Sequence, residues 1–558
     1  MKKAALVVCV LLCLGLVSVF AATPALKTIV YNPNSPTGGL TVPWLTQPLT
    51  VTWLKPGNWK NDGVLAGIIK EKLKIIPQIT AFPEDQYGQK LQLMIVSDSL
   101  PDLVFFENFD VNNIDKLGAS GRLVAMDKYF PIMPNTRKLL ADWPALMPWL
   151  SAPDGHIYHT GRWGSYAPLG IATSAHLIRN DVFQKYGITQ KWDTYDNFYA
   201  TLKALKAKTP DYYPWGTRSF SGMFNAMAWG FGTGWERWAS GWGGMYYDDR
   251  SDTYKFAPYD PGYKAMVAFL AKAYAEGILH PEVPTMNSDL FFKYWTNTAD
   301  GAVYTGLAVN SGDTVTWESD WQHGKMKGHE GQDVLFLKPP VANVAGARAV
   351  YQNGQIDAWS LGVGFAVNSK AKNPQALMTL LDYMVSKEGM FFFDWGKEGV
   401  TFRWFNSPTF GKIPVPFKSP VENYGSDSGQ FYDAVVRDLQ WDAGFSDWGI
   451  NIKSSPERAG IPYSGALKLE VQTRAKQYMI APAPRVMMDD ISQELYTSTQ
   501  ADLSKMIQEN VTSFVIGKKP MADWDKFIAD AKQNADLCLQ IMNKAWASTK
   551  KIVAGLGK

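Results

Sequence analysis

The sequence reads LTVTWL at 49–54, IIPQITAF at 75–82 and LVFF at 103–106, three apolar runs typical of β-strands. Between them, apolar residues recur with helical spacing at 62–72 and 85–97. Because strands and helices alternate in the order strand, helix, strand, helix, strand, the segment predicts an α/β fold with a parallel, doubly wound sheet.

Polar residues follow two of these predicted strands. Asn58 and Trp59 come after the first, and Glu107 and Asn108 come after the third. Doubly wound sheets bind ligands beyond the carboxyl ends of their strands, so we expect these four side chains to line one cleft. There Glu107 would accept hydrogen bonds from hydroxyl groups; the alternative is a solvated loop carboxylate.

The remaining chain continues the α/β pattern and ends in helices. A second alternation of strands and helices runs over residues 178–357, followed by an apolar strand at 361–368 and an amphipathic helix at 374–385. The C-terminal third is helical, with apolar residues at helical spacing over 521–532.

The composition narrows the class of protein. With 558 residues, 46% hydrophobic and 19% charged, the chain is neither disordered nor a multi-span membrane protein. Its 55 basic and 52 acidic residues nearly cancel, and no basic run is present, so we expect no nucleic-acid partner. Of three cysteines only Cys538 lies beyond residue 21, which excludes an intrachain disulfide and a Cys-rich metal site there.

The first 21 residues have the pattern of a signal peptide. Lys2 and Lys3 precede an apolar run from Ala4 to Phe20, and cleavage is expected after Ala21. The alternative, an uncleaved membrane anchor, requires about 20 spanning residues, and this run is shorter. We therefore expect a soluble exported protein, located in the periplasm or on the outer cell surface, whose residues 22–47 form an extended segment rich in Pro, Gly and Asn.

The 22 tryptophans are the unusual feature of the composition. Five fall within 28 residues, interleaved with eight glycines: Trp215, Trp229, Trp235, Trp238 and Trp242. A plain apolar helix would not carry so many glycines, because each costs up to about 1 kcal/mol. The pattern predicts loops and short helices that present indoles, which stack on the C–H faces of sugars. The alternative is core packing.

Two Arg-Trp pairs add further candidates. Arg162 beside Trp163 and Arg403 beside Trp404 would clamp sugar hydroxyls or a uronate carboxylate, with surface ion pairs as the alternative. The complete set of expected ligand contacts is Asn58, Trp59, Glu107, Asn108, Arg162, Trp163, Trp215, Trp235, Trp317, Trp359, Arg403 and Trp404.

Several local patterns match one family in the right order. They are the helix-turn-strand segment Tyr87–Val104 with its Leu-Pro-Asp turn, Gly121–Tyr129, Ile178–Phe183, Trp192–Phe198, Gly364–Leu377, Gly396–Val400 and Phe514–Pro520. The sequence resembles the extracellular solute-binding proteins of family 1, which serve ABC sugar importers, and within them the large branch related to alginate-binding proteins.

The resemblance implies a fold like that of type II periplasmic binding proteins. Two α/β lobes joined by a hinge are expected, the first from 48–177 with 358–410 returning to it, the second from 178–357. The remaining residues, 411–558, form helices packed mainly on the second lobe. The resemblance also implies a monomer that delivers an oligosaccharide to the permease subunits of an ABC importer.

Metal and cofactor signals are weak. Alginate-binding relatives carry an Asp/Asn-rich calcium loop, but the matching residues 208–215 read KTPDYYPW and lack the spacing of oxygen ligands. Asp248, Asp249 and Asp252 do not match a calcium loop either. We expect neither metal nor cofactor.

No catalytic motif is evident. The glycines of 230–234 lack the spacing and preceding strand of a dinucleotide loop, and the six histidines do not cluster. A sugar receptor without enzymatic activity is the leading hypothesis. The alternatives are a secreted glycosidase or lyase, whose paired carboxylates no pattern reveals, and a receptor of the same fold for a non-sugar ligand.

Overall fold

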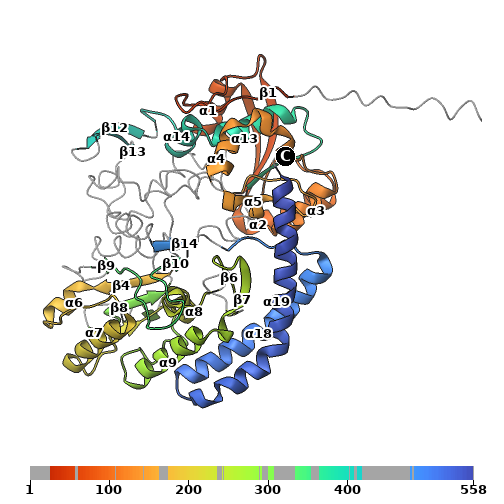
Figure 1. Cartoon of the computed structure of the whole chain (residues 1–558). Helices are drawn as coiled ribbons and strands as arrows, with labels where there is room; N and C mark the ends of the chain where they lie inside the picture. Colours follow the sequence, from red (N-terminus) through yellow and green to blue (C-terminus); the bar gives the residue numbers. More distant parts are fainter. Residues whose placement is uncertain are drawn as a thin grey trace, which may run out of the picture.

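The computed structural model shows two α/β lobes with long C-terminal helices along one side (Figure 1). It describes residues 26–56, 61–106, 109–142, 144–161, 174–235, 242, 244–287, 290–291, 294, 299–306, 334–352, 364–400, 402–407, 411–416, 478–480 and 483–556. The expected signal peptide lies outside the described residues. Within these ranges, no helix has both the length and the apolar character needed to span a bilayer.

The first lobe contains the sheet predicted from its N-terminal strands. Strands β1 (Leu49–Pro56), β2 (Ile75–Phe82) and β3 (Leu103–Phe106) are parallel, and β11 (Gly364–Val367) joins antiparallel at the edge, giving the order β11-β3-β1-β2. Helices α1 (Val64–Leu73) and α2 (Glu84–Val96) make the two crossovers. Strand β11 therefore adds residues 364–367 to the sheet of the first lobe.

Helices cover both faces of this sheet because β3 is apolar on both sides. Leu103 and Phe105 pack into one core together with α13 (Pro374–Met384), whereas Val104 and Phe106 pack into the opposite core together with α2. The described part of this lobe also includes α3 (Val111–Ala119), the 3-10 turn η1 (Met126–Ile132), α4 (Pro134–Asp142), α5 (Met147–Leu150), α14 (Lys387–Trp395) and the hairpin of β12 (Phe402–Ser407) and β13 (Gly411–Pro416).

The second lobe is built on a mixed sheet of order β5-β8-β4-β9. Strand β4 (Ala175–Arg179) runs antiparallel to both β8 (Val303–Gly306) and β9 (Val334–Phe336), and β5 (Trp215–Gly216) is parallel to β8. The first residue of β4, Ala175, pairs with Gly306 of β8. Among its described residues, the lobe has the helices α6 (Asn180–Lys185), α7 (Tyr195–Lys208), α8 (Phe220–Met227) and α9 (Pro261–Ala275).

Two long helices end the chain. Helix α18 (Asp490–Val515) packs on α9, and its buried residues join the core of the second lobe. Helix α19 (Trp524–Gly555) contacts the hairpin of β6 (Met245–Asp248) and β7 (Thr253–Phe256), and its far end reaches α5 of the first lobe (Figure 1). The C-terminal helices therefore connect the lobes.

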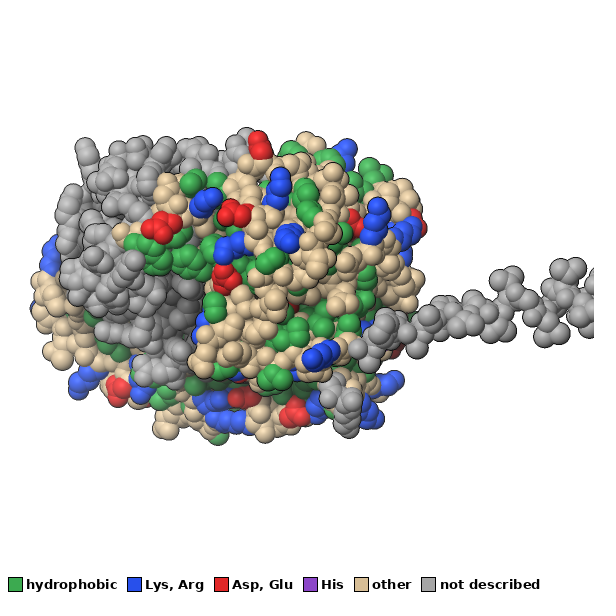
Figure 2. Space-filling view, turned by 90° about the horizontal axis from the view of Figure 1, so that it is seen from above, with side chains coloured by type: hydrophobic (Ala, Val, Ile, Leu, Met, Phe, Trp, Pro, Cys, Tyr) green, Lys and Arg blue, Asp and Glu red, His purple; other side chains and the backbone are tan. Residues whose placement is uncertain are grey.

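A short two-stranded ladder contacts helix α8 of the second lobe. Strand β10 (Tyr351–Gln352) pairs with β14 (Met479–Ile480), just before the extended residues 483–488 that lead into α18. Seen from above, the described residues present Lys and Arg side chains interspersed with Asp and Glu (Figure 2). This distribution agrees with the near-zero charge balance of the sequence.

Candidate functional site

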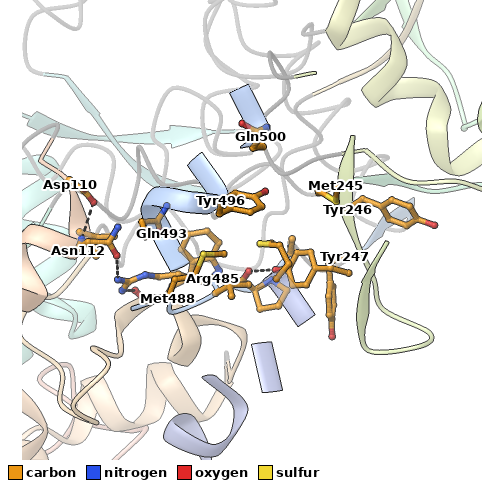
Figure 3. A pocket seen from close by; sticks show the side chains of 17 residues that line it. Asp110, Asn112, Met245, Tyr246, Tyr247, Arg485, Met488, Gln493, Tyr496 and Gln500 are labelled. Carbon is orange, nitrogen blue, oxygen red and sulfur yellow. Dashed lines mark hydrogen bonds between the residues drawn. The ribbon is translucent and has the colours of Figure 1, made fainter. Parts of the chain in front are cut away.

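A cavity of about 330 Å³ lies where the two lobes and the C-terminal segment meet (Figure 3). The first lobe contributes Asp110, Val111, Asn112 and Trp149; the second lobe contributes Met245, Tyr246, Tyr247 and Tyr254; and the C-terminal region contributes Ala483, Pro484, Arg485, Val486, Met488, Gln493, Tyr496, Gln500 and Met542. This size suits a small ligand or one or two units of a longer one.

The wall from the first lobe is the start of α3, which follows β3. Asp110 is the N-cap residue of this helix, and its carboxylate accepts a hydrogen bond from the Asn112 backbone N–H at 2.9 Å. Because Asp110 lies four residues beyond Phe106, the last residue of β3, the cavity is close to the carboxyl end of that strand. Ligand sites of doubly wound sheets are found at such positions.

Arg485 fixes the C-terminal segment to this wall. Its guanidinium donates to the Asp115 carboxylate at 2.5 Å and to Asn112 Oδ1 at 2.8 Å. It also donates to the backbone carbonyls of Trp149 and Ser151 at 3.3 and 3.2 Å. Burial raises the pKa of Asp115 to about 6, an effect that the positive charge of Arg485 opposes. Arg485 therefore acts as a cross-link rather than as a free cation.

The wall from the second lobe is the β6–β7 hairpin, whose tyrosine hydroxyls are engaged by the protein. Tyr246 donates to Asp260 at 2.8 Å, Tyr247 donates to Asp252 at 2.7 Å, and Tyr254 donates to the Pro484 carbonyl at 2.6 Å. Tyr247 and Tyr254 are cross-strand partners, with ring centroids 5.5 Å apart. The hairpin therefore contributes ring surface rather than free hydroxyl groups.

The third wall is one face of α18. Gln493, Tyr496 and Gln500 are spaced by three and four residues, which places them on the same side of a helix, and all three are half-buried. Figure 3 shows them in a row above Arg485. Together with the hairpin, this face surrounds the cavity with aromatic rings and planar amides.

Trp215 and Trp235, expected from the sequence to contact the ligand, are buried in the structure. Trp215 is fully buried, and its indole N–H donates to Thr305 Oγ1 at 2.7 Å. Trp235 is 2% exposed and stacks on Tyr263, with the ring planes 4° apart. Both indoles belong to the core of the second lobe, as the alternative interpretation of the sequence had it.

The glycines around these tryptophans explain why the indoles are buried. A Cβ atom on Gly230 would lie 2.4 Å from the Pro340 carbonyl oxygen, and one on Gly234 would overlap the Tyr246 ring. Trp229 and Trp242, the other described members of the group, are also buried. Glycine therefore allows the aromatic core to pack closely and does not create an exposed indole surface.

The other expected contacts have different outcomes. Trp404 on β12 is partly exposed and stacks on Phe391 of α14 with centroids 5.8 Å apart, while only the backbone of Arg403 is described, in β12. The expected contacts Asn58, Trp59, Glu107, Asn108, Arg162, Trp163, Trp317 and Trp359 lie outside the described residues.

The carboxylates of the β6–β7 hairpin are engaged in ion pairs. Asp248 contacts Lys255 at 2.5 Å, and Asp252 contacts Lys550 at 2.5 Å. Asp249 pairs with Arg348. In the described part of the chain, no three His, Cys, Asp or Glu side chains are grouped so that they could hold a metal ion.

Sequence reasoning missed the tyrosines of the hairpin and of α18. The pattern that could have indicated the hairpin tyrosines is the run MYYD at 245–248 next to a turn. For α18 it is the helical spacing of Gln493, Tyr496 and Gln500. Neither pattern differs from that of an ordinary hairpin or helix unless the two segments are known to face each other.

Comparisons with known proteins place the chain in a family. The family model described as bacterial extracellular solute-binding protein matches residues 69–391. A comparison with curated proteins finds no match.

Solved structures with similar folds include three binding proteins. One is the alginate-binding protein AlgQ2, at 19% identity and a TM-score of 0.56. Another is an HMO-binding, ABC-transporter-associated protein from Bifidobacterium longum infantis, at 17% identity and a TM-score of 0.61. The third is FusA of Streptococcus pneumoniae, an ABC-transporter substrate-binding protein in complex with kestose, at 16% identity and a TM-score of 0.56. Each comparison covers 90% of this chain and 99% of the other.

These matches confirm the predicted fold class, two α/β lobes like those of type II periplasmic binding proteins, and they confirm the resemblance noted in the sequence. Because the family model covers more than half of its length, the chain belongs to the bacterial extracellular solute-binding protein family.

Proposed function

We propose that this protein captures an oligosaccharide between its two lobes, outside the cytoplasmic membrane, and delivers it to the permease subunits of an ABC importer. The observation that carries the proposal is the cavity formed jointly by α3, the β6–β7 hairpin and α18. Its aromatic rings suit the C–H faces of sugars, and its amides suit their hydroxyl groups. The alginate and kestose named for two structural neighbours are ligands of the same chemical class.

The expected affinity follows from ring stacking. A sugar face that covers about 100 Å² of an aromatic ring gains about 2.5 kcal/mol at about 25 cal/mol/Å². Two such contacts and a few hydrogen bonds approach the roughly 8 kcal/mol of a micromolar complex. Tyr247 and Tyr496 are the half-buried rings of the cavity, so we assign the stacking to them.

Delivery requires a conformational change that depends on the ligand. A ligand that contacts both lobes at once binds only the closed arrangement, and this difference in affinity shifts the population toward that state. Closure of two domains around a ligand, by rotation about a hinge, is the general behaviour of periplasmic binding proteins. The permease would then recognise the closed monomer.

The ligand is expected to leave unchanged, since we propose a receptor and not an enzyme. Incubation of the purified protein with polysaccharides should produce no new reducing ends and no unsaturated sugar products. New ends formed at a catalytic rate would instead support the secreted glycosidase or lyase considered above.

Calorimetry tests the proposal. The chain without residues 1–21 is titrated with panels of neutral and uronate oligosaccharides of two to six units. Micromolar or tighter binding of at least one panel member is expected. Absence of binding across both panels would contradict the proposal and would favour a non-sugar ligand of the same fold.

A further inference from the structure

The cavity presents little positive charge to a ligand. Among the described residues that line it, the formally charged side chains are Asp110 and Arg485. Several neighbouring charges on the same elements are paired: Asp248 with Lys255, Asp252 with Lys550, and Lys116 with Asp490. Recognition of an acidic ligand would therefore depend on Arg485.

Arg485 is already neutralised within the protein. The guanidinium is 5% exposed, the Asp115 carboxylate that it contacts is 4% exposed, and their atoms are 2.5 Å apart. Both terminal nitrogens also donate to first-lobe oxygens of Asn112, Trp149 and Ser151. A ligand carboxylate would have to share one guanidinium with the buried Asp115, and two carboxylates at one cation repel each other.

Asp110 adds a negative charge on the ligand side, for which the described residues supply no ion-pair partner. Its side chain is exposed, and the contact described for its carboxylate is the capping bond from the Asn112 backbone N–H. A carboxylate is an acceptor of hydroxyl protons, so it favours a neutral sugar and repels a uronate. Gln493 and Gln500 on the opposite wall also offer neutral partners for hydroxyl groups.

From these charges we infer that the cavity selects neutral oligosaccharides over uronates: it accepts a hydroxymethyl group at C6 of the sugar and rejects a carboxylate there. The inference rests on the proposed function and narrows its substrate class. It assigns the discrimination to exposed Asp110 and to the pairing of Arg485 with Asp115.

Matched sugar pairs test the inference. Each pair has the same length, linkage and ring stereochemistry and differs only at C6, as for manno-oligosaccharides against mannuronate oligosaccharides and for cello-oligosaccharides against their glucuronate counterparts. Dissociation constants are measured at pH 7.5 in low and high salt. We expect the neutral member of the binding pair to bind at least about 10-fold tighter, with an affinity that changes less than about twofold with salt.

The outcomes separate this inference from the proposed function. Tighter binding of a uronate member, weakened by salt, overturns the inference but supports the proposed function. If no member of any pair binds, both the inference and the proposed function are contradicted. Preference for the neutral member supports both.

A single substitution assigns the discrimination to Asp110. Asp110→Asn keeps a good N-cap for α3 while removing the charge. We expect the ratio of neutral to uronate affinity to fall by about threefold or more, because the negative charge that repels a uronate is removed. Asp523→Asn, at the N-cap position of α19 and outside the cavity lining, is the matched control and should leave discrimination unchanged. Equal effects of both variants, or none from Asp110→Asn, would overturn the role of Asp110.

Discussion

Arg485 and Asp115 meet at 2.5 Å where the segment that leads into α18 crosses the first lobe. The same segment is held to the second lobe because the Tyr254 hydroxyl donates to the Pro484 carbonyl, and it is held to α19 because the Met487 N–H donates to Thr549 Oγ1. The ion pair thus fixes residues 483–488 to the first lobe. Both lobes contact this segment, which forms the floor of the cavity (Figure 3).

Replacing Arg485 should strongly destabilise the fold. Arg485→Met leaves the buried Asp115 carboxylate without its cation, which costs about 3–5 kcal/mol for a broken buried pair. Urea unfolding measures the loss. Lys264→Met removes an exposed partner of Asp525 and should cost less than about 1 kcal/mol. A loss below about 1 kcal/mol for Arg485→Met as well would show that the pair does not hold the segment.

Removing the Tyr496 ring should weaken oligosaccharide binding without unfolding the protein. Tyr496→Ala deletes a half-buried ring on the cavity wall, and a stacking loss of about 2 kcal/mol corresponds to about 30-fold in dissociation constant. Calorimetry with the ligand found for the wild type measures the change. Leu495→Ala, at the adjacent and exposed position of α18, should leave affinity unchanged. Equal affinities of Tyr496→Ala and the wild type would exclude Tyr496 as a contact.

Trp235 should contribute stability and not affinity. Trp235→Ala opens a cavity beside Phe224 and Tyr263 in the core, at a cost of about 3–5 kcal/mol. Thermal unfolding reports the cost, and calorimetry at low temperature on the folded variant should give an affinity within about threefold of the wild type. A large loss of affinity with little loss of stability would restore Trp235 as a ligand platform.

His176 should make the fold sensitive to acid. The ring is fully buried between Thr305 Oγ1 at 2.6 Å and the Tyr195 hydroxyl at 3.1 Å, and burial lowers the pKa of His176 to about 3. The unfolded chain keeps a pKa near 6.5, so between about pH 6.5 and 3 only the unfolded state takes up the proton and folding stability falls as pH decreases.

The matching variant is His176→Gln, which keeps a polar buried side chain but cannot titrate. Relative to the wild type, it should be less destabilised at pH 4.5 than at pH 7.5, by an amount on the order of 1–2 kcal/mol. Urea unfolding at the two pH values measures the difference. A stability difference that does not change with pH would show that His176 is not kept neutral by the fold.

The fold could be predicted from the sequence because its signals are local. The alternating strands and helices at 49–106 identify the first sheet, and the apolar run at 361–368 predicts the separate strand that is β11. Its antiparallel pairing with β3, more than 250 residues earlier in the chain, could be expected only from the family resemblance.

The candidate site could be predicted only in part because it depends on contacts between distant segments. Asp110 follows the end of β3, where a ligand site was expected, but Tyr247 and Tyr496 come from a hairpin and a helix that meet only in the folded protein. The tryptophan pattern gave a wrong prediction because a glycine beside an aromatic ring has two possible roles. It can leave room for a sugar, or it can leave room for another ring of the core, and the sequence looks the same in both cases. Gly234 leaves room for the Tyr246 ring.

Small-angle scattering of the chain without residues 1–21, with and without an oligosaccharide, tests most directly whether the ligand joins the two lobes. We predict a smaller radius of gyration in the bound state and, at a ligand concentration between the two dissociation constants, a smaller change for Tyr496→Ala than for the wild type. Saturation by calorimetry with an unchanged radius of gyration would contradict binding between the lobes.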